Sequence, residues 1–209
     1  MRTLDPVSVP RVRLPPAERR RQIVQAATEV IGRRGYYGFS VAAVAERCGL
    51  TVAGLLHHVG TKDGLLIAVL EDRDRRDSEA VTGRAGLWLP EAVGVLALPE
   101  AVQLLHDLVQ RNRSQPEIVR LYSMLRTESL YEGHPAHEFF ARRDEQVLGL
   151  FARLVSGHVA APASTARQLL ALMGGLEEQW LRDPDGVDLV AEWDRAVAAV
   201  LPAPLTPRG

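Results

Sequence analysis

The stretch from Ser40 to Lys62 most constrains what this chain can fold into, because it predicts two short helices joined by a tight turn. Ser40 can cap the first helix by accepting a hydrogen bond from a backbone N–H, and apolar residues then recur every three or four positions. Gly49 is expected to end this helix, and Thr51 offers a cap for a second helix over residues 52–58. A third helix is expected to begin at Lys62.

Two short helices this close together in the sequence must cross steeply, which is the geometry of a helix-turn-helix. In that motif the second helix enters the major groove of DNA, and its first residues contact base edges. The start of the third helix brings a lysine and free backbone N–H groups to one place, and both favour phosphate. The candidate DNA contacts are therefore Ser40, Thr51, Val52, Ala53, Gly54, His57, His58 and Lys62.

The segment ahead of this pair extends the pattern. Residues 16–35 keep an apolar helical period and end at a glycine. Together with the segment that follows, they closely resemble the N-terminal domain of the TetR family of one-component transcriptional regulators. The resemblance covers about residues 16–70, and the pieces that carry it are Arg20-Ile23-Ala26-Ala27, Arg34-Gly35-Tyr36, Ser40-Val41-Val44-Ala45, Cys48-Gly49-Leu50-Thr51 and His58-Lys62-Asp63-Leu65-Leu66.

The resemblance implies an all-α chain, with a three-helix helix-turn-helix DNA-binding domain over residues 16–64 and a helical effector-binding and dimerisation bundle over residues 65–201. Two positions depart from the family pattern. The family usually has an aromatic residue before the histidine, where this chain has Leu56 two places before His58, and a Phe after it, where this chain has Val59. The first departure removes a residue that often contacts phosphate or a thymine methyl, and the second keeps an apolar anchor.

Charge is divided unevenly along the chain. Residues 1–62 contain ten basic and four acidic residues, a net charge of +6, so the remainder carries −7 within a total of −1. A polyanion would therefore be attracted to one end of the protein. Residues 1–15 are expected to form a disordered basic arm and residues 202–209 a disordered tail. Because there is no apolar leader and no long apolar run, a cytoplasmic protein without a membrane partner is expected.

The rest of the chain predicts helices throughout and shows neither strand alternation nor an internal repeat. Pro and Gly signals separate the predicted helices, and such a succession favours antiparallel helices in a bundle. The predicted ranges are 62–80, 100–113, 116–131, 136–159, 164–182 and 187–201.

Two of these helices, 136–159 and 164–182, are apolar over a wider stripe than one core needs. They are interpreted as a dimerisation pair, which the resemblance also implies, so that two helices from each subunit form a four-helix bundle. A homodimer would present two recognition helices to a pseudo-palindromic operator. The alternative is that both are central helices of a monomeric core. The candidate interface residues are Phe151, Leu154, Leu169, Met173, Leu176 and Trp180.

An effector pocket is expected among the helices between residues 65 and 180. Small-molecule sites combine aromatic surface with a few polar groups, although aromatic residues at helical spacing also occur as ordinary core. The candidate pocket residues are Trp88, His106, Tyr122, Leu125, Glu128, Phe140 and Trp180.

Two other functions remain open at this stage. An all-helical metal-dependent enzyme could use His134 and His137, with Glu132 and Glu138 nearby, but Pro135 between the histidines argues against one continuous helix. A DNA-binding protein without a regulatory role is the other alternative. The favoured interpretation is a transcriptional regulator, most simply a repressor, that is controlled by a small molecule, is not an enzyme and needs no cofactor.

Overall fold

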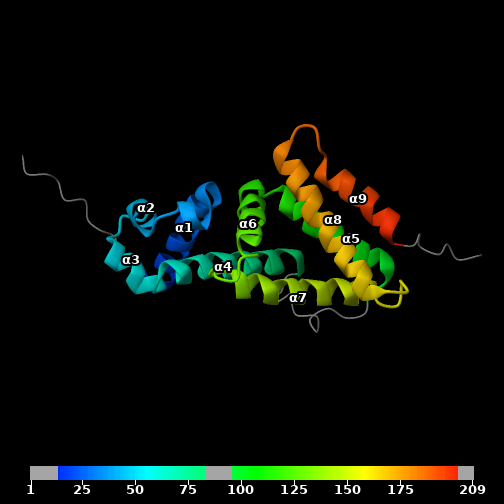
Figure 1. Cartoon of the computed structure of the whole chain (residues 1–209), viewed down its shortest axis with the longest axis horizontal. Coiled ribbons are helices and arrows are strands. Elements are labelled where there is room, and N and C mark those ends of the chain that lie inside the picture. The colour runs from blue at the N-terminus through cyan, green and yellow to red at the C-terminus, as the bar shows by residue number, and fades with distance from the viewer. Residues whose placement is uncertain (1–13, 83–95, 202–209) are drawn as a thin grey trace, which may run out of the picture.

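The computed structural model describes residues 14–82 and 96–201, and within these ranges the chain is helical with no strand. The predicted all-α fold is confirmed. The helices are α1 (Pro16–Gly38), α2 (Val41–Arg47), α3 (Val52–Val59), α4 (Lys62–Thr82), α5 (Leu98–Arg113), α6 (Pro116–Glu128), α7 (His137–Val155), α8 (Pro162–Arg182) and α9 (Leu189–Val200). The molecule is elongated, with α2 and α3 at one end, α9 at the other, and α4 running lengthwise (Figure 1).

Two predicted helices were too long at their C-terminal ends. The helix predicted over 116–131 ends at Glu128, and the one predicted over 136–159 ends at Val155. Each stops where the backbone leaves helical geometry, at a turn after Ser129 in one case and before the left-handed Gly157 in the other. The predicted arm over residues 1–15 and tail over 202–209 fall almost wholly outside the described residues. None of the described helices is long and apolar enough to span a bilayer.

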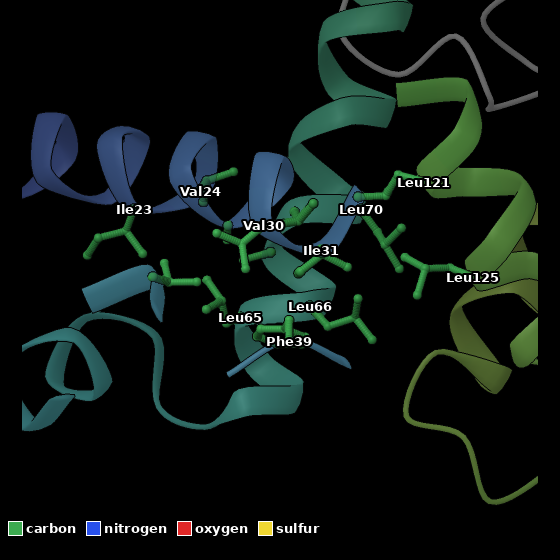
Figure 2. Packing of buried hydrophobic residues seen from close by; sticks show 14 of the residues in the cluster. Ile23, Val24, Val30, Ile31, Phe39, Leu65, Leu66, Leu70, Leu121 and Leu125 are labelled. Carbon is green, nitrogen blue, oxygen red and sulfur yellow. The ribbon is translucent and has the colours of Figure 1, made fainter. Parts of the chain in front are cut away.

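The N-terminal helices share one core with α6 and the start of α7. Figure 2 shows Ile31 of α1 close to Leu66 of α4, with Ile23 of α1 at one end of the cluster and Leu121 and Leu125 of α6 at the other. This core crosses the predicted boundary between residues 64 and 65, so the helix-turn-helix and the following helices are packed as one continuous body. The placement of that boundary stays a prediction.

A kink near the end of α1 joins the helix-turn-helix end of the molecule to α6. Gly35 has φ 66° and ψ −179°, a conformation that is essentially restricted to glycine. The kink frees the backbone N–H of Tyr36, which donates to Glu128 Oε2 at 3.3 Å. A Cβ at position 35 would lie 2.7 Å from Glu128 Oε1, so the glycine also makes room for this contact. Residues 92 positions apart are thereby linked.

A buried ionic network fixes the middle of α4 to the C-terminal helices. Asp74 accepts from Arg143 Nε of α7 at 2.9 and 3.0 Å. One turn later, Asp77 lies 2.7 Å from Arg73 Nε on its own helix and accepts from Arg111 Nε of α5 at 2.7 Å. Because both acids belong to α4, this helix is held by charge as well as by apolar packing.

Candidate nucleic-acid interface and effector cavity

The helix α3 presents one side to solvent and anchors the other in the core. Leu55 is fully buried, whereas Thr51, Ala53 and His57 are exposed, and Val52 is 42% exposed. Small exposed side chains along the first turn permit close approach to a groove. The geometry needed for reading DNA with the start of α3 is therefore present.

Leu56 and Val59, the two departures from the family pattern, both pack partly buried against the N-terminal core. They hold α3 to the domain, and neither lies on its exposed side. Arg20 of α1 strengthens this attachment, because its Nη1 donates to the carbonyl oxygen of His58 at 3.0 Å. A cation at the end of a helix interacts favourably with the helix dipole. The His58 ring is half-buried and lies edge-to-face with His57, at 5.6 Å between ring centroids.

Side-chain caps set the starts of the helices at this end of the molecule. Ser40 Oγ accepts from Ala43 N at 3.2 Å, and Thr51 Oγ1 accepts from Gly54 N at 3.1 Å, as predicted. The two hydroxyls are thus engaged within the protein as well as being exposed. Thr61 Oγ1 caps the next helix by accepting from the N–H of Gly64 at 2.9 Å.

We expect Thr51→Ala to lower the free energy of unfolding by about 1 kcal/mol, because an N-cap hydroxyl would be lost from α3. Thr51→Ser keeps the hydroxyl and should retain most of that stability. Urea unfolding followed by circular dichroism measures both. Equal losses in the two variants would mean that the cap does not hold the recognition helix.

Lys62 at the start of α4 is half-buried against aromatic rings. Its Nζ lies 4.4 Å from the centroid of the Tyr36 ring and 4.6 Å from that of Phe39. The Tyr36 hydroxyl is hydrogen-bonded to Asp63, and burial followed by that bond raises the pKa of Tyr36 to about 12. The rings thus hold the ammonium group at the helix start, immediately after α3.

The C-terminal body encloses a cavity of about 90 Å³ with walls from α4, α5, α6, α7 and α8. Its apolar wall includes Leu108, Val119, Phe151 and Met173. Its charged and polar lining comprises Arg73, Asn112, Tyr122, Arg126, Arg143, Glu177 and Glu178, with Ser123 and Thr127. A cavity that combines an apolar wall with a few convergent polar groups is typical of a small-molecule site.

Of the seven predicted pocket residues, only Tyr122 lines this cavity. It is buried, and its hydroxyl donates to the carbonyl oxygen of Leu70 at 2.7 Å. None of the other predicted residues that the structure describes lines this cavity. Leu125 and Phe140 pack in the N-terminal core, and Trp180 packs in the C-terminal core. Glu128 accepts a hydrogen bond from the backbone N–H of Tyr36, and His106 pairs with Asp194 at the surface at 2.9 Å. Trp88 lies outside the described residues.

The predicted dimer residues are also mostly inside the protomer. Phe151, Leu154, Leu169, Met173 and Trp180 are buried in the C-terminal core of a single chain, so they are not free to form an interface. Only Leu176 keeps accessible apolar surface. The reason is that α8 is apolar on two sides, and the side that carries the larger residues packs in the C-terminal core, where α8 contacts α6, α7 and α9.

The other side of α8 forms an open apolar hollow of about 440 Å³. A Cβ added at Gly175 would meet nothing within 4 Å, so the backbone there is accessible to close approach. The hollow is lined by Gln168, Ala171, Leu172, Gly175, Leu176 and Gln179 of α8 with Val200 of α9. These positions recur at three- and four-residue spacing, as they do on one face of a helix.

Comparisons with known proteins agree with this geometry. Residues 23–69 match the sequence model of bacterial regulatory proteins of the tetR family. This is the segment that holds most of α1, all of α2 and α3, and the start of α4. This segment is of the TetR family.

Two relatives and a solved structure extend the similarity beyond this segment. The chain is 28% identical over 173 residues to the transcriptional regulator BetI of Escherichia coli, covering 78% of this chain and 81% of that one. It is 24% identical to the transcriptional repressor BepR of Brucella suis, covering 88% and 91%. NalD of Pseudomonas aeruginosa, the secondary repressor of the MexAB-OprM multidrug efflux pump, shares the fold with a TM-score of 0.67 at 22% identity, covering 91% of this chain and 98% of that one.

The alternative of a metal-dependent enzyme finds no support in the structure around His134 and His137. His134 is buried, and its Nδ1 accepts from Ala136 N at 3.1 Å. His137 Nδ1 lies 2.8 Å from the carbonyl oxygen of Ser129, to which it donates. Both rings therefore stabilise the turn between α6 and α7, and the described residues contain no cluster of three His, Cys, Asp or Glu suited to a metal ion.

Proposed function

We propose that this TetR-family regulator is a repressor that binds a pseudo-palindromic operator as a homodimer and is released by a small molecule. The observation that carries the proposal is the exposed first turn of α3, which is capped by Thr51 and anchored behind by the fully buried Leu55. The DNA contacts proposed are those of the exposed α3 side with Ser40, His58 and Lys62. The names of BepR and NalD, both repressors, favour repression over activation.

The homodimer is proposed to form through the open hollow on α8 and α9, in place of the buried residues predicted from the sequence. An apolar face with a glycine at its centre suits packing against a second copy of itself. The effector is proposed to occupy the cavity among α4 to α8, since this cavity adjoins α4, the helix that begins directly after α3.

The test is selection of bound duplexes from a random DNA pool at moderate salt, followed by sequencing of the enriched fraction. Enrichment of an inverted repeat is the expected result, since a two-fold symmetric dimer reads two half-sites. Enrichment of a single unrepeated half-site would contradict the dimer, and no enrichment by a folded dimer would contradict the operator.

Lys62→Ala is expected to weaken binding to all DNA sequences alike, with the slope of log affinity against log salt reduced by roughly 1. The reason is that a phosphate contact carries charge but no sequence information. Fluorescence anisotropy over a salt series, with the selected operator and a scrambled duplex, measures both. Arg142→Ala, an exposed cation on α7, is the matched control and should leave affinity and slope unchanged. A change of sequence preference without a loss of affinity would place Lys62 against a base.

A further inference from the structure

Glu177 of α8 stands out among the charged residues of the effector cavity. Its Oε1 accepts a hydrogen bond from Asn112 Nδ2 at 2.6 Å, and within the described parts of the chain it makes no ion pair. Burial raises the pKa of its carboxyl group above the usual range, although Arg73 and the Asn112 bond act in the opposite direction. Arg143 and Arg126 also lower this pKa from a distance, but none of these arginines forms a direct ion pair with Glu177 among the described residues. A desolvated carboxylate that accepts a single hydrogen bond is costly, and a ligand that supplied a positive charge in direct contact would reduce that cost.

The arginines of the same cavity are already matched by acids. Arg143 Nε donates to both carboxylate oxygens of Asp74, and Arg126 Nη2 donates to Asp144 at 3.0 Å. Arg73 lies 2.7 Å from Asp77 at its Nε. An anionic ligand would have to compete with these carboxylates, whereas a cation at Glu177 would displace none of them.

The neighbours of Glu177 fit a ligand with a charged head and a short apolar body. Phe151, Met173 and Leu170 line the same cavity and offer only apolar surface. The faces of the Tyr122 ring are occupied by guanidinium groups, with Arg73 at 3.9 Å and Arg143 at 5.1 Å from the centroid. The lining has one other carboxylate, Glu178, which is half exposed and lies 3.8 Å from Arg182. The carboxylate left without an ion pair to receive an ammonium group is therefore Glu177.

We propose that the effector is a small organic amine, whose ammonium group binds the Glu177 carboxylate and whose hydrocarbon part lies against Phe151 and Met173. This inference rests on the proposed effector role of the cavity. Asn112 connects the site to α4, because its Nδ2 donates to Glu177 while its Oδ1 accepts from Arg73 Nη2 at 3.4 Å. An ammonium group at Glu177 competes with the Asn112 amide for the carboxylate and so changes the contact that α4 makes through Arg73.

The experiment compares three series of probes with the same hydrocarbon chains, from methyl to hexyl: alkylammonium ions, alcohols and carboxylates. Isothermal calorimetry with the full-length protein in the absence of DNA measures each affinity. The ammonium series is expected to bind more tightly than either other series at the same chain length. Glu177→Gln should weaken ammonium binding roughly 10- to 100-fold, the range for a lost hydrogen bond to a charged group.

The matched control is Glu145→Gln, which removes an exposed carboxylate on α7 outside the cavity and should leave ammonium affinity unchanged. Circular dichroism establishes that both variants remain folded. Tighter binding of the carboxylate probes would mean that the arginines of the cavity bind anions, and it would overturn the proposal. Ammonium binding that is unchanged in Glu177→Gln would also overturn it, and so would the absence of ammonium binding. Calorimetry uses no DNA, so it tests amine binding separately from operator binding. If no amine binds but an operator is selected, the amine proposal fails and the repressor proposal stands. If amines bind but no operator is selected, the repressor proposal fails and the amine site stands.

Discussion

Asp77→Ala should lower the free energy of unfolding by about 3 to 5 kcal/mol, the loss typical of breaking a buried ion pair by removing one partner. Asp77 is 1% exposed and serves two arginines from two helices, at 2.7 Å from Arg73 Nε and 2.7 Å from Arg111 Nε. Without it, the Arg73 guanidinium stays buried and loses its nearest acid. Arg111, which is partly exposed, can recover hydration, so the main cost arises at Arg73.

Urea unfolding of the wild type and the variant measures this loss. Asp72→Ala is the matched control, because Asp72 lies on the same helix and pairs at 2.7 and 2.8 Å with Arg75 and Arg76, whose side chains are about half exposed. Surface pairs of this kind contribute at most about 1 kcal/mol. Similar losses in the two variants would mean that burial does not set the strength of the Asp77 network.

Local signals explain why the helix-turn-helix could be predicted from the sequence. The caps at Ser40 and Thr51 bond to N–H groups three residues further on, and Gly49 takes its left-handed conformation at φ 63°. Each of these interactions involves residues within one helical turn of each other, so neighbouring residues alone determine it. The predicted all-helical body succeeded for the same reason, since Pro and Gly at the ends of helices act on their immediate neighbours.

The cavity depends on contacts that no local pattern reveals. Asn112 meets Arg73 across 39 residues and Glu177 across 65 residues. The sequence pattern predicted aromatic residues with two polar ones, His106 and Glu128, but these pair with Asp194 and Tyr36 away from the cavity. A usable signal was present, because Glu177 falls between Met173 and Trp180 on the otherwise apolar inner side of α8.

The same helix shows why the dimer residues were misplaced. Both Met173 and Leu176 are large and apolar, and a helix with apolar residues on two sides does not indicate which side meets its own protomer. That choice is made by the packing of α6, α7 and α9, which bury Met173 and leave Leu176 accessible. The sequence pattern therefore could not distinguish the face of α8 that packs within its own protomer from the face that stays accessible.

Leu176→Glu is expected to convert the proposed dimer into a monomer. By two-fold symmetry the substitution would bury two carboxylates in one apolar interface, so the dimer dissociation constant should rise on the order of 1000-fold or more, at about 2 kcal/mol per buried charge. The protomer should remain folded, because Leu176 retains accessible surface in the single chain. Sedimentation equilibrium should give a mass of 23.0 kDa for the variant and twice that for the wild type.

Leu130→Glu provides the control, since Leu130 is an equally large apolar residue that is 79% exposed after α6, outside the hollow on α8. It should leave both the dimer and operator binding unchanged. Operator affinity should fall steeply only for Leu176→Glu, because two half-sites bound by independent monomers lose the advantage of linkage. A Leu176→Glu protein that stayed dimeric would move the interface off this face of α8. A monomer that kept full operator affinity would instead mean that one recognition helix is sufficient for binding. The dimer would then no longer explain an inverted repeat in the selected DNA.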